Sequence, residues 1–130
     1  MTKNYAELSD AFERYDIDPG AFTHADHVDV AYQMLSRYDF LEALTRYSQC
    51  INTIASAAGA AHKFNVTITL TFLSIVVARM RTTEHTNYAE FLKNNPEVLN
   101  TSVLKQWYSS DQLASELVRT VFLMPKASPA

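Results

Sequence analysis

Apolar side chains recur every third or fourth residue over most of the chain, which is the spacing of helices that bury one face. Polar residues suited to helix starts stand in front of four of these stretches, at Thr23, Asp39, Thr86 and Ser109. The pattern predicts helices over residues 5–15, 23–37, 39–58, 66–80, 86–93 and 111–123, with a short turn beginning at Pro96.

The stretch 66–80 allows two interpretations. From residue 66 to residue 72 apolar residues alternate with threonines, as in a half-buried strand. Taken as a helix, the same stretch places small and polar residues on one stripe, made of Thr67, Thr71, Ser74 and Ala78. No second stretch shows a clear strand pattern that could pair with it, so we predict a helix.

The composition agrees with helices joined by short loops. The 130 residues include only two glycines, which is few for a β-sandwich or barrel, and 48% are hydrophobic, which is enough for one core. We therefore predict an all-α fold: a compact single-domain helical bundle of about five to six helices. The domain spans residues 1–130, with frayed tails at 1–4 and 125–130.

The charge pattern argues against two classes of partner. The net charge is −3 and the basic residues form no run, so we expect no nucleic-acid binding. The apolar stretch 66–80 is too short and too rich in threonine to span a bilayer, so we expect no membrane segment.

No signal-peptide pattern is present, and Cys50, the only cysteine, lies in a stripe that suggests burial. These features predict a cytoplasmic protein.

The sharpest candidate site is His24-Ala25-Asp26-His27, at the start of the second predicted helix. Residues three apart lie on the same helix face, and this face continues into apolar positions, so both imidazoles should point inward. Such a pair could act as a general acid and base near neutral pH, or could bind one metal ion through neutral nitrogens. Packing and a hydrogen bond to a neighbouring loop would explain the two histidines equally well.

A second cluster of candidates surrounds the start of the helix predicted over 66–80. Asn65 is suited to cap this helix, and Asn65, Thr67 and Thr71 could also supply an amide and hydroxyls to the histidine pocket. The backbone carbonyl one turn earlier is the alternative partner for such hydroxyls. Tyr32 could help to orient a substrate. His62, in the preceding loop, could add a third imidazole to a metal site.

Two motifs occur in order, Phe22-Thr23-His24-x-x-His27 and Lys63-Phe64-x-x-Thr67-Ile68-Thr69. With the later segment around Trp107-Tyr108-Ser109, they resemble a family of small, poorly characterised bacterial helical proteins. In that family the second motif typically reads Tyr-His-Glu-Thr, which implies a metal site of three imidazoles and one carboxylate.

This chain departs from the family pattern at both expected ligands. Asn65 stands at the position of the histidine and Val66 at the position of the glutamate. Asparagine is a weak metal ligand and valine is none. Either His62 and Asp26 compensate, or the pocket contains no metal and is built from the two N-terminal histidines with Asn65 and Thr67. We favour the pocket without metal.

Three functions are compatible with these observations. The first is an enzyme acting on a small molecule, with His24 and His27 as acid–base groups. The second is a protein that binds a transition-metal ion through His24, His27 and His62. The third is a non-catalytic interaction module that could form a homodimer, because seven tyrosines and a methionine- and aromatic-containing C-terminal segment could cover a partner.

Overall fold

The computed structural model describes residues 5–125; the predicted tail 1–4 and residues 126–130 lie outside this range. All regular structure within it is helical, which confirms the predicted all-α single domain. No helix in this range has the length and apolarity needed to cross a bilayer. The α-helices are α1 (Tyr5–Glu13), α2 (His24–Arg37), α3 (Phe40–Ala57), α4 (Val66–Thr82), α5 (Tyr88–Asn94), α6 (Ser110–Leu113) and α7 (Glu116–Thr120). Short 3-10 turns lie between them: η1 (Pro19–Ala21), η2 (Ala61–Lys63), η3 (Pro96–Leu99) and η4 (Thr101–Gln106).

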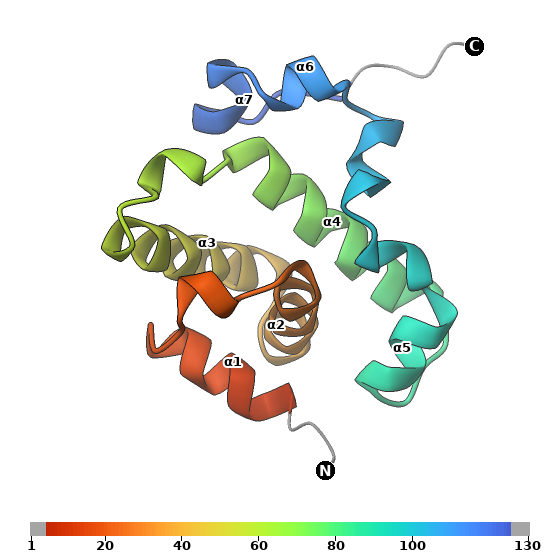
Figure 1. Ribbon diagram of the computed structural model, residues 1–130. Helices are drawn as coiled ribbons and strands as arrows, with labels where there is room; N and C mark the ends of the chain where they lie inside the picture. The colour runs from red at the N-terminus through yellow and green to blue at the C-terminus, as the bar shows by residue number, and fades with distance from the viewer. Residues whose placement is uncertain (1–4, 126–130) are drawn as a thin grey trace, which may run out of the picture.

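The helix α2 occupies the centre of the bundle (Figure 1). It contacts α1, α3, α4 and the η3 turn. The helix α4 lies between this group and the C-terminal elements, since it also contacts η4 and α7. Because α4 has neighbours on two sides, both of its flanks contribute to the interior of the molecule.

One hydrophobic core forms where the first five helices meet. Its largest fully buried apolar side chains include Phe12 of α1, Met34 of α2, Leu73 of α4 and Phe91 of α5. Burying an apolar side chain of this size stabilises the fold by roughly 1.5–3 kcal/mol. This core packs α2 against α4, and the starts of these two helices form the candidate site described below.

The stretch with alternating threonines is helical, as predicted. Asn65 caps α4, and its side-chain oxygen accepts a hydrogen bond from the backbone N–H of Ile68 at 2.9 Å. No strand occurs between residues 5 and 125, so a strand here would have had no partner for its backbone groups. A helix satisfies those groups within the segment itself.

Three predicted helix boundaries differ from the structure. The helix predicted to begin at Thr86 is α5, and Asn87 caps it instead, since its side-chain oxygen accepts the Glu90 N–H at 2.9 Å. The first helix ends at Glu13 rather than Tyr15, where the backbone adopts a positive φ of 61°. The helix predicted over 111–123 is divided into α6 and α7. Ser115 caps α7 by accepting the Val118 N–H at 3.4 Å, and it thereby starts a new helix in the middle of the predicted one.

Candidate functional site

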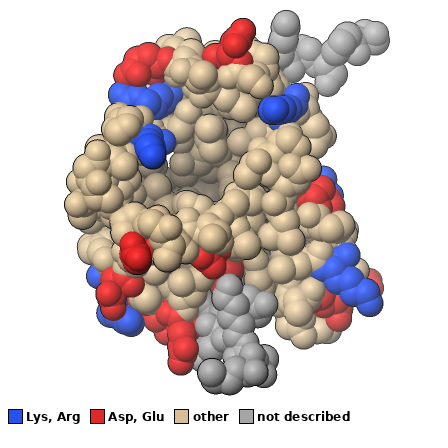
Figure 2. Space-filling view, in the orientation of Figure 1, with Lys and Arg blue, Asp and Glu red and all other residues tan. Residues whose placement is uncertain are grey.

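A cavity of about 330 Å³ opens where the starts of α2 and α4 face each other. Figure 2 shows this side of the molecule, with a deep hollow bounded mostly by uncharged side chains. The structure thus brings together the two helix starts that the sequence predicts to share a pocket. The cavity is lined by His24, His27, Tyr47, Ile51, Lys63, Phe64, Asn65, Ile68, Thr69, Phe72, Thr101, Val103, Leu104 and Leu113.

His24 is the first residue of α2, and a capping box sets its position. Thr23 Oγ1 accepts the Asp26 N–H at 3.2 Å, while the Asp26 carboxylate accepts the Thr23 N–H at 3.0 Å. The His24 ring reaches the η3 turn, where its Nε2 lies 3.0 Å from the carbonyl oxygen of Val98. Because a carbonyl only accepts, Nε2 carries the proton, and Nδ1 is the nitrogen left for a ligand.

His27 lies one turn further along α2 and is held by a buried phenol. Its Nδ1 is 2.9 Å from the hydroxyl of Tyr47, a buried residue of α3. The ring of Phe22 packs against the imidazole, with the ring centroids 4.5 Å apart. The His27 Nε2 makes no hydrogen bond to any residue between 5 and 125.

Burial keeps the His27–Tyr47 pair uncharged. Removal from water and, to a lesser degree, the neighbouring His24 lower the pKa of His27 from 6.5 to about 4, although the Asp26 carboxylate acts in the opposite direction. Burial also raises the pKa of the Tyr47 phenol far above its usual range. At neutral pH the cavity wall therefore carries a neutral imidazole next to a protonated phenol.

Asn65 serves both of the roles considered for it from the sequence. It caps α4 and also lines the cavity. Its Nδ2 donates to the carbonyl oxygen of Leu113 at 3.2 Å, which ties α4 to α6. Both the oxygen and the nitrogen of the Asn65 amide therefore form hydrogen bonds within the protein, and the amide helps to hold the C-terminal wall of the cavity in place.

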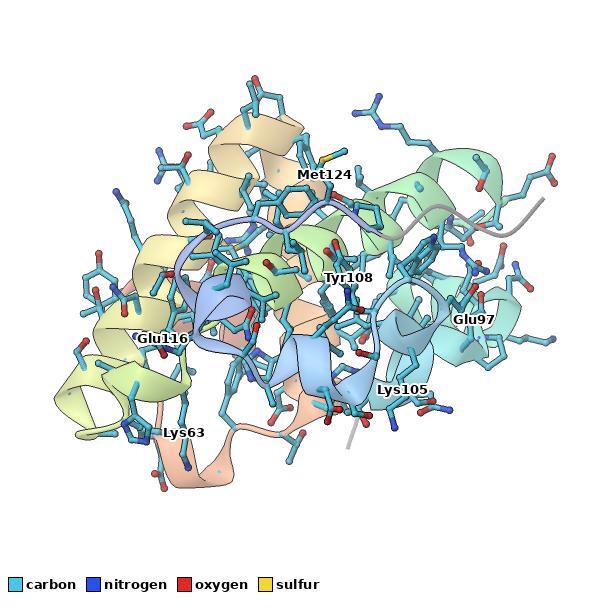
Figure 3. All side chains as sticks on the ribbon, turned by 90° about the horizontal axis from the view of Figure 1, so that it is seen from above. Lys63, Glu97, Lys105, Tyr108, Glu116 and Met124 are labelled. Atoms are coloured by element: carbon cyan, nitrogen blue, oxygen red, sulfur yellow. The ribbon has the colours of Figure 1, made fainter. Side chains whose placement is uncertain are left out.

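The remaining polar groups of the cavity come from three further residues. Thr69 of α4, Thr101 of η4 and Lys63 of η2 line the cavity and carry two hydroxyls and an ammonium group. Lys63 is exposed, and Figure 3 shows its side chain extending away from the end of η2. It forms no ion pair with a carboxylate of the described residues.

Thr67, a predicted substrate-binding residue, does not line the cavity. It is completely buried on another side of α4. Its hydroxyl donates to the carbonyl oxygen of Val121 at 2.8 Å and accepts the N–H of Leu123 at 3.0 Å. Thr67 therefore fastens the C-terminal segment to α4, and these contacts leave its hydroxyl unavailable to a ligand.

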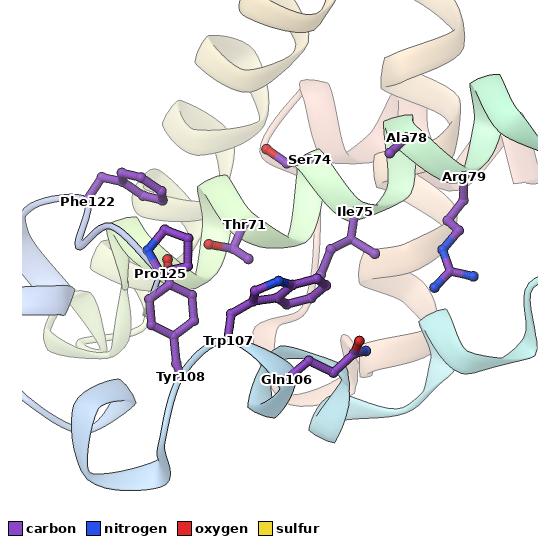
Figure 4. Close-up of a pocket in the computed structure, with 10 residues that line it drawn as sticks. All are labelled: Thr71, Ser74, Ile75, Ala78, Arg79, Gln106, Trp107, Tyr108, Phe122 and Pro125. Atoms are coloured by element: carbon purple, nitrogen blue, oxygen red, sulfur yellow. The ribbon is translucent and has the colours of Figure 1, made fainter. Parts of the chain in front are cut away.

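Thr71 belongs to a second cavity, of about 440 Å³, on the other side of α4 (Figure 4). Its hydroxyl is buried and has no hydrogen-bond partner within residues 5–125. The polar stripe of α4 thus faces away from the histidines, and a mostly apolar stripe faces them instead. The second cavity is lined by Thr71, Ser74, Ile75, Ala78, Arg79, Gln106, Trp107, Tyr108, Phe122 and Pro125.

Two other predicted site residues also lie outside the histidine cavity. Tyr32 is buried in an aromatic cluster, with its ring centroid 5.0 Å from those of Tyr88 and Phe91 and 5.6 Å from that of His85. Tyr32 lies about two turns further along α2 than His24 and does not line the cavity. His62 is exposed in η2 and does not line the cavity.

The predicted three-imidazole metal site is not assembled. Among residues 5–125 no group of three or more histidine, cysteine, aspartate or glutamate side chains is placed to hold a metal ion. His24 already uses Nε2 on a backbone carbonyl, and His62 lies outside the cavity. Asn65 is a weak metal ligand and Val66 is none.

Tyr47 is a residue of the candidate site that the sequence analysis missed. It lies on the buried stripe of α3 with Cys50 and Ile54, and its hydroxyl contacts His27. A tyrosine in an apolar stripe needs a hydrogen-bond partner when it is buried, which is a signal present in the sequence. The pattern does not say which residue that partner is, because α2 and α3 meet only in the folded chain.

No family model, curated protein or solved structure matches this chain. The proposals below therefore depend on the geometry of the cavity and its surroundings.

Proposed function

We propose that this chain is an enzyme that acts on a small molecule in the histidine cavity, with His24 and His27 as acid–base groups. The observation that carries the proposal is that each imidazole uses one nitrogen to fix its ring and keeps the other for a ligand. His24 is fixed by the carbonyl of Val98, and His27 is fixed by the hydroxyl of Tyr47. Rings held in this way are suited to exchange protons with a bound molecule.

The two histidines are suited to different tasks. The neutral His24 ring has its proton on Nε2, so Nδ1 can accept a proton from a ligand. When the Tyr47 hydroxyl donates to Nδ1 of His27, Nε2 of His27 carries a proton and can donate to a ligand oxygen. A neutral imidazole can polarise a carbonyl group in this manner. The pair would thus support proton transfer next to a carbonyl.

Hydrogen exchange in D₂O tests this proposal without a known substrate. Carbonyl compounds that stabilise the protein against heat would be incubated with it, and deuterium incorporation beside the carbonyl would be followed by NMR. We expect His24→Gln to slow exchange by about a hundredfold, the effect typical of losing a general base. The exposed His62→Gln is the matched control and should exchange at the wild-type rate. Unchanged exchange in both His24→Gln and His27→Gln would refute the proposal.

An interaction module is the second candidate, favoured by an apolar surface near the C-terminal end of the described chain. Leu117 and Met124 are 57% and 74% exposed, and Val121 and Phe122 between them are also exposed. These residues lie close together along the chain, and exposed apolar residues that form a contiguous surface mark contact sites for partners, including a second copy of the chain. Light scattering of the wild type and of Met124→Glu tests for a homodimer. A monomer at all concentrations would exclude self-association.

A further inference from the structure

One residue supplies the formal charge in the lining of the histidine cavity. Lys63 is the only residue with a formal charge among the fourteen residues that line it, all of which lie in the described part of the chain. The neighbouring end of α4 adds to this positive charge. Backbone N–H groups at a helix start carry partial positive charge, and the first turn of α4 contains no acidic residue to offset it.

The rest of the lining is mainly apolar. Aliphatic and aromatic side chains make up most of the wall, including Ile51, Ile68, Phe72 and Leu104. Burial keeps the His27 ring neutral at neutral pH. The cavity thus offers one cationic group at its rim and apolar surface over most of its area.

We propose that the ligand of this cavity is a small monocarboxylate with an apolar body, and that Lys63 binds its carboxylate. This inference rests on the proposed function, because it names the class of molecule that His24 and His27 would act on. The apolar body would lie against Ile68 and Phe72 and exclude water from the two imidazoles. Apolar contact supplies affinity in such a site, while the ion pair fixes the orientation of the ligand.

A single negative charge fits the cavity better than two. One carboxylate neutralises the one ammonium group of Lys63. A dianion would leave a second charge against the neutral His27 ring and the apolar walls, which carries a desolvation cost without a compensating partner. The cavity therefore favours a carboxylate over a phosphate monoester or a dicarboxylate.

Titration with a matched pair of compounds tests the proposal. The probes are 3-phenylpropanoate and its uncharged amide, 3-phenylpropanamide, and binding is followed by NMR through the imidazole signals of His24 and His27. We expect the carboxylate to bind about tenfold more tightly than the amide, the effect of one charge-assisted hydrogen bond. Lys63→Met should reduce this preference to about twofold and leave the amide affinity unchanged.

Two controls locate the effect. Lys105→Met removes an equal charge from an exposed lysine that does not line the cavity (labelled in Figure 3), and it should keep the preference. The indole N–H signal of Trp107 reports on the second cavity and should not move. Trp107 is the only tryptophan of the chain, so this signal is unambiguous.

The possible outcomes separate this inference from the proposed function. A preference that survives Lys63→Met overturns the inference. If both compounds bind equally and His27→Gln weakens both, the cavity is a ligand site but the inference about carboxylates is wrong. Failure of both probes to bind also overturns the inference, while the deuterium-exchange experiment with the wider set of carbonyl compounds still decides the proposed function.

Discussion

Replacing Thr67 by valine should weaken the attachment of the C-terminal segment to α4. The substitution keeps the shape of the side chain but removes the hydroxyl that bonds to the carbonyl of Val121 and the N–H of Leu123. Each hydrogen bond contributes about 1 kcal/mol net, so the free energy of unfolding should fall by about 2 kcal/mol. For a chain of 130 residues this lowers Tm by about 7 °C.

Thr71→Val is the matched control, because Thr71 lies one turn further along the same helix. Its hydroxyl is buried without a partner within the described residues, so nothing is lost when a methyl group replaces it. We expect no change or a gain of about 1 kcal/mol in the free energy of unfolding. Thermal and urea unfolding followed by circular dichroism would measure both variants under identical conditions.

The comparison also tests the position of the C-terminal segment. In Thr67→Val, amide hydrogen exchange at Leu123 should accelerate because its N–H loses its acceptor, whereas Thr71→Val should leave this exchange rate unchanged. Equal destabilisation by the two substitutions would refute the reasoning, since only the Thr67 hydroxyl makes hydrogen bonds that the substitution removes.

Three further predictions concern single groups. The pKa of His27 is lower in the folded protein than in the unfolded chain, where it is 6.5. The neutral ring therefore contributes its whole share of the free energy of unfolding above pH 6.5, and this share is lost as the pH drops toward about 4. At about 1.4 kcal/mol for each pH unit, the loss is about 3 kcal/mol. His27→Gln should flatten this part of the stability–pH curve, and the exposed His62→Gln should not. Burial raises the pKa of Cys50 to about 11, so the native thiol should react with a thiol reagent at pH 8 far more slowly than the urea-unfolded chain; equal rates would contradict its burial. Equimolar Zn²⁺ should leave Tm within about 1 °C, since at most two imidazoles face the cavity; a rise of several degrees that His24→Ala abolishes would show a site that the ligand geometry does not explain.

The helix starts could be predicted from the sequence because their signals are local. Thr23, Asp39 and Ser109 all cap helices at or next to the predicted positions, and each accepts a backbone N–H three residues ahead. The cavity shared by α2 and α4 could be predicted for the same reason, since it lies at two such helix starts. The end of the last helix could not be predicted in this way. Ser115 provides a competing cap within the predicted helix, and Thr67, which is distant in sequence, holds the chain beyond α7.

The rotation of α4 about its own axis could not be predicted from the sequence either. Its threonine stripe suggested a polar face directed at the histidines, yet Thr67 and Thr71 face other parts of the molecule. An even mixture of threonine and aliphatic residues defines no strong apolar face, so the contacts made by neighbouring elements decide the rotation of the helix. Tyr47 was missed for a related reason, because its contact with His27 depends on how α3 packs against α2.

The His24–Val98 hydrogen bond joins residues 74 positions apart, and the Asn65–Leu113 hydrogen bond joins residues 48 apart. Contacts this distant along the chain form late, because closing long loops costs entropy that only an existing core offsets. During synthesis α1, α2 and α3 can pack before the far wall has left the ribosome. We therefore expect a nascent chain arrested before residue 98 to contain folded N-terminal helices but no ligand site, so that capacity for binding appears only in the final stage of assembly.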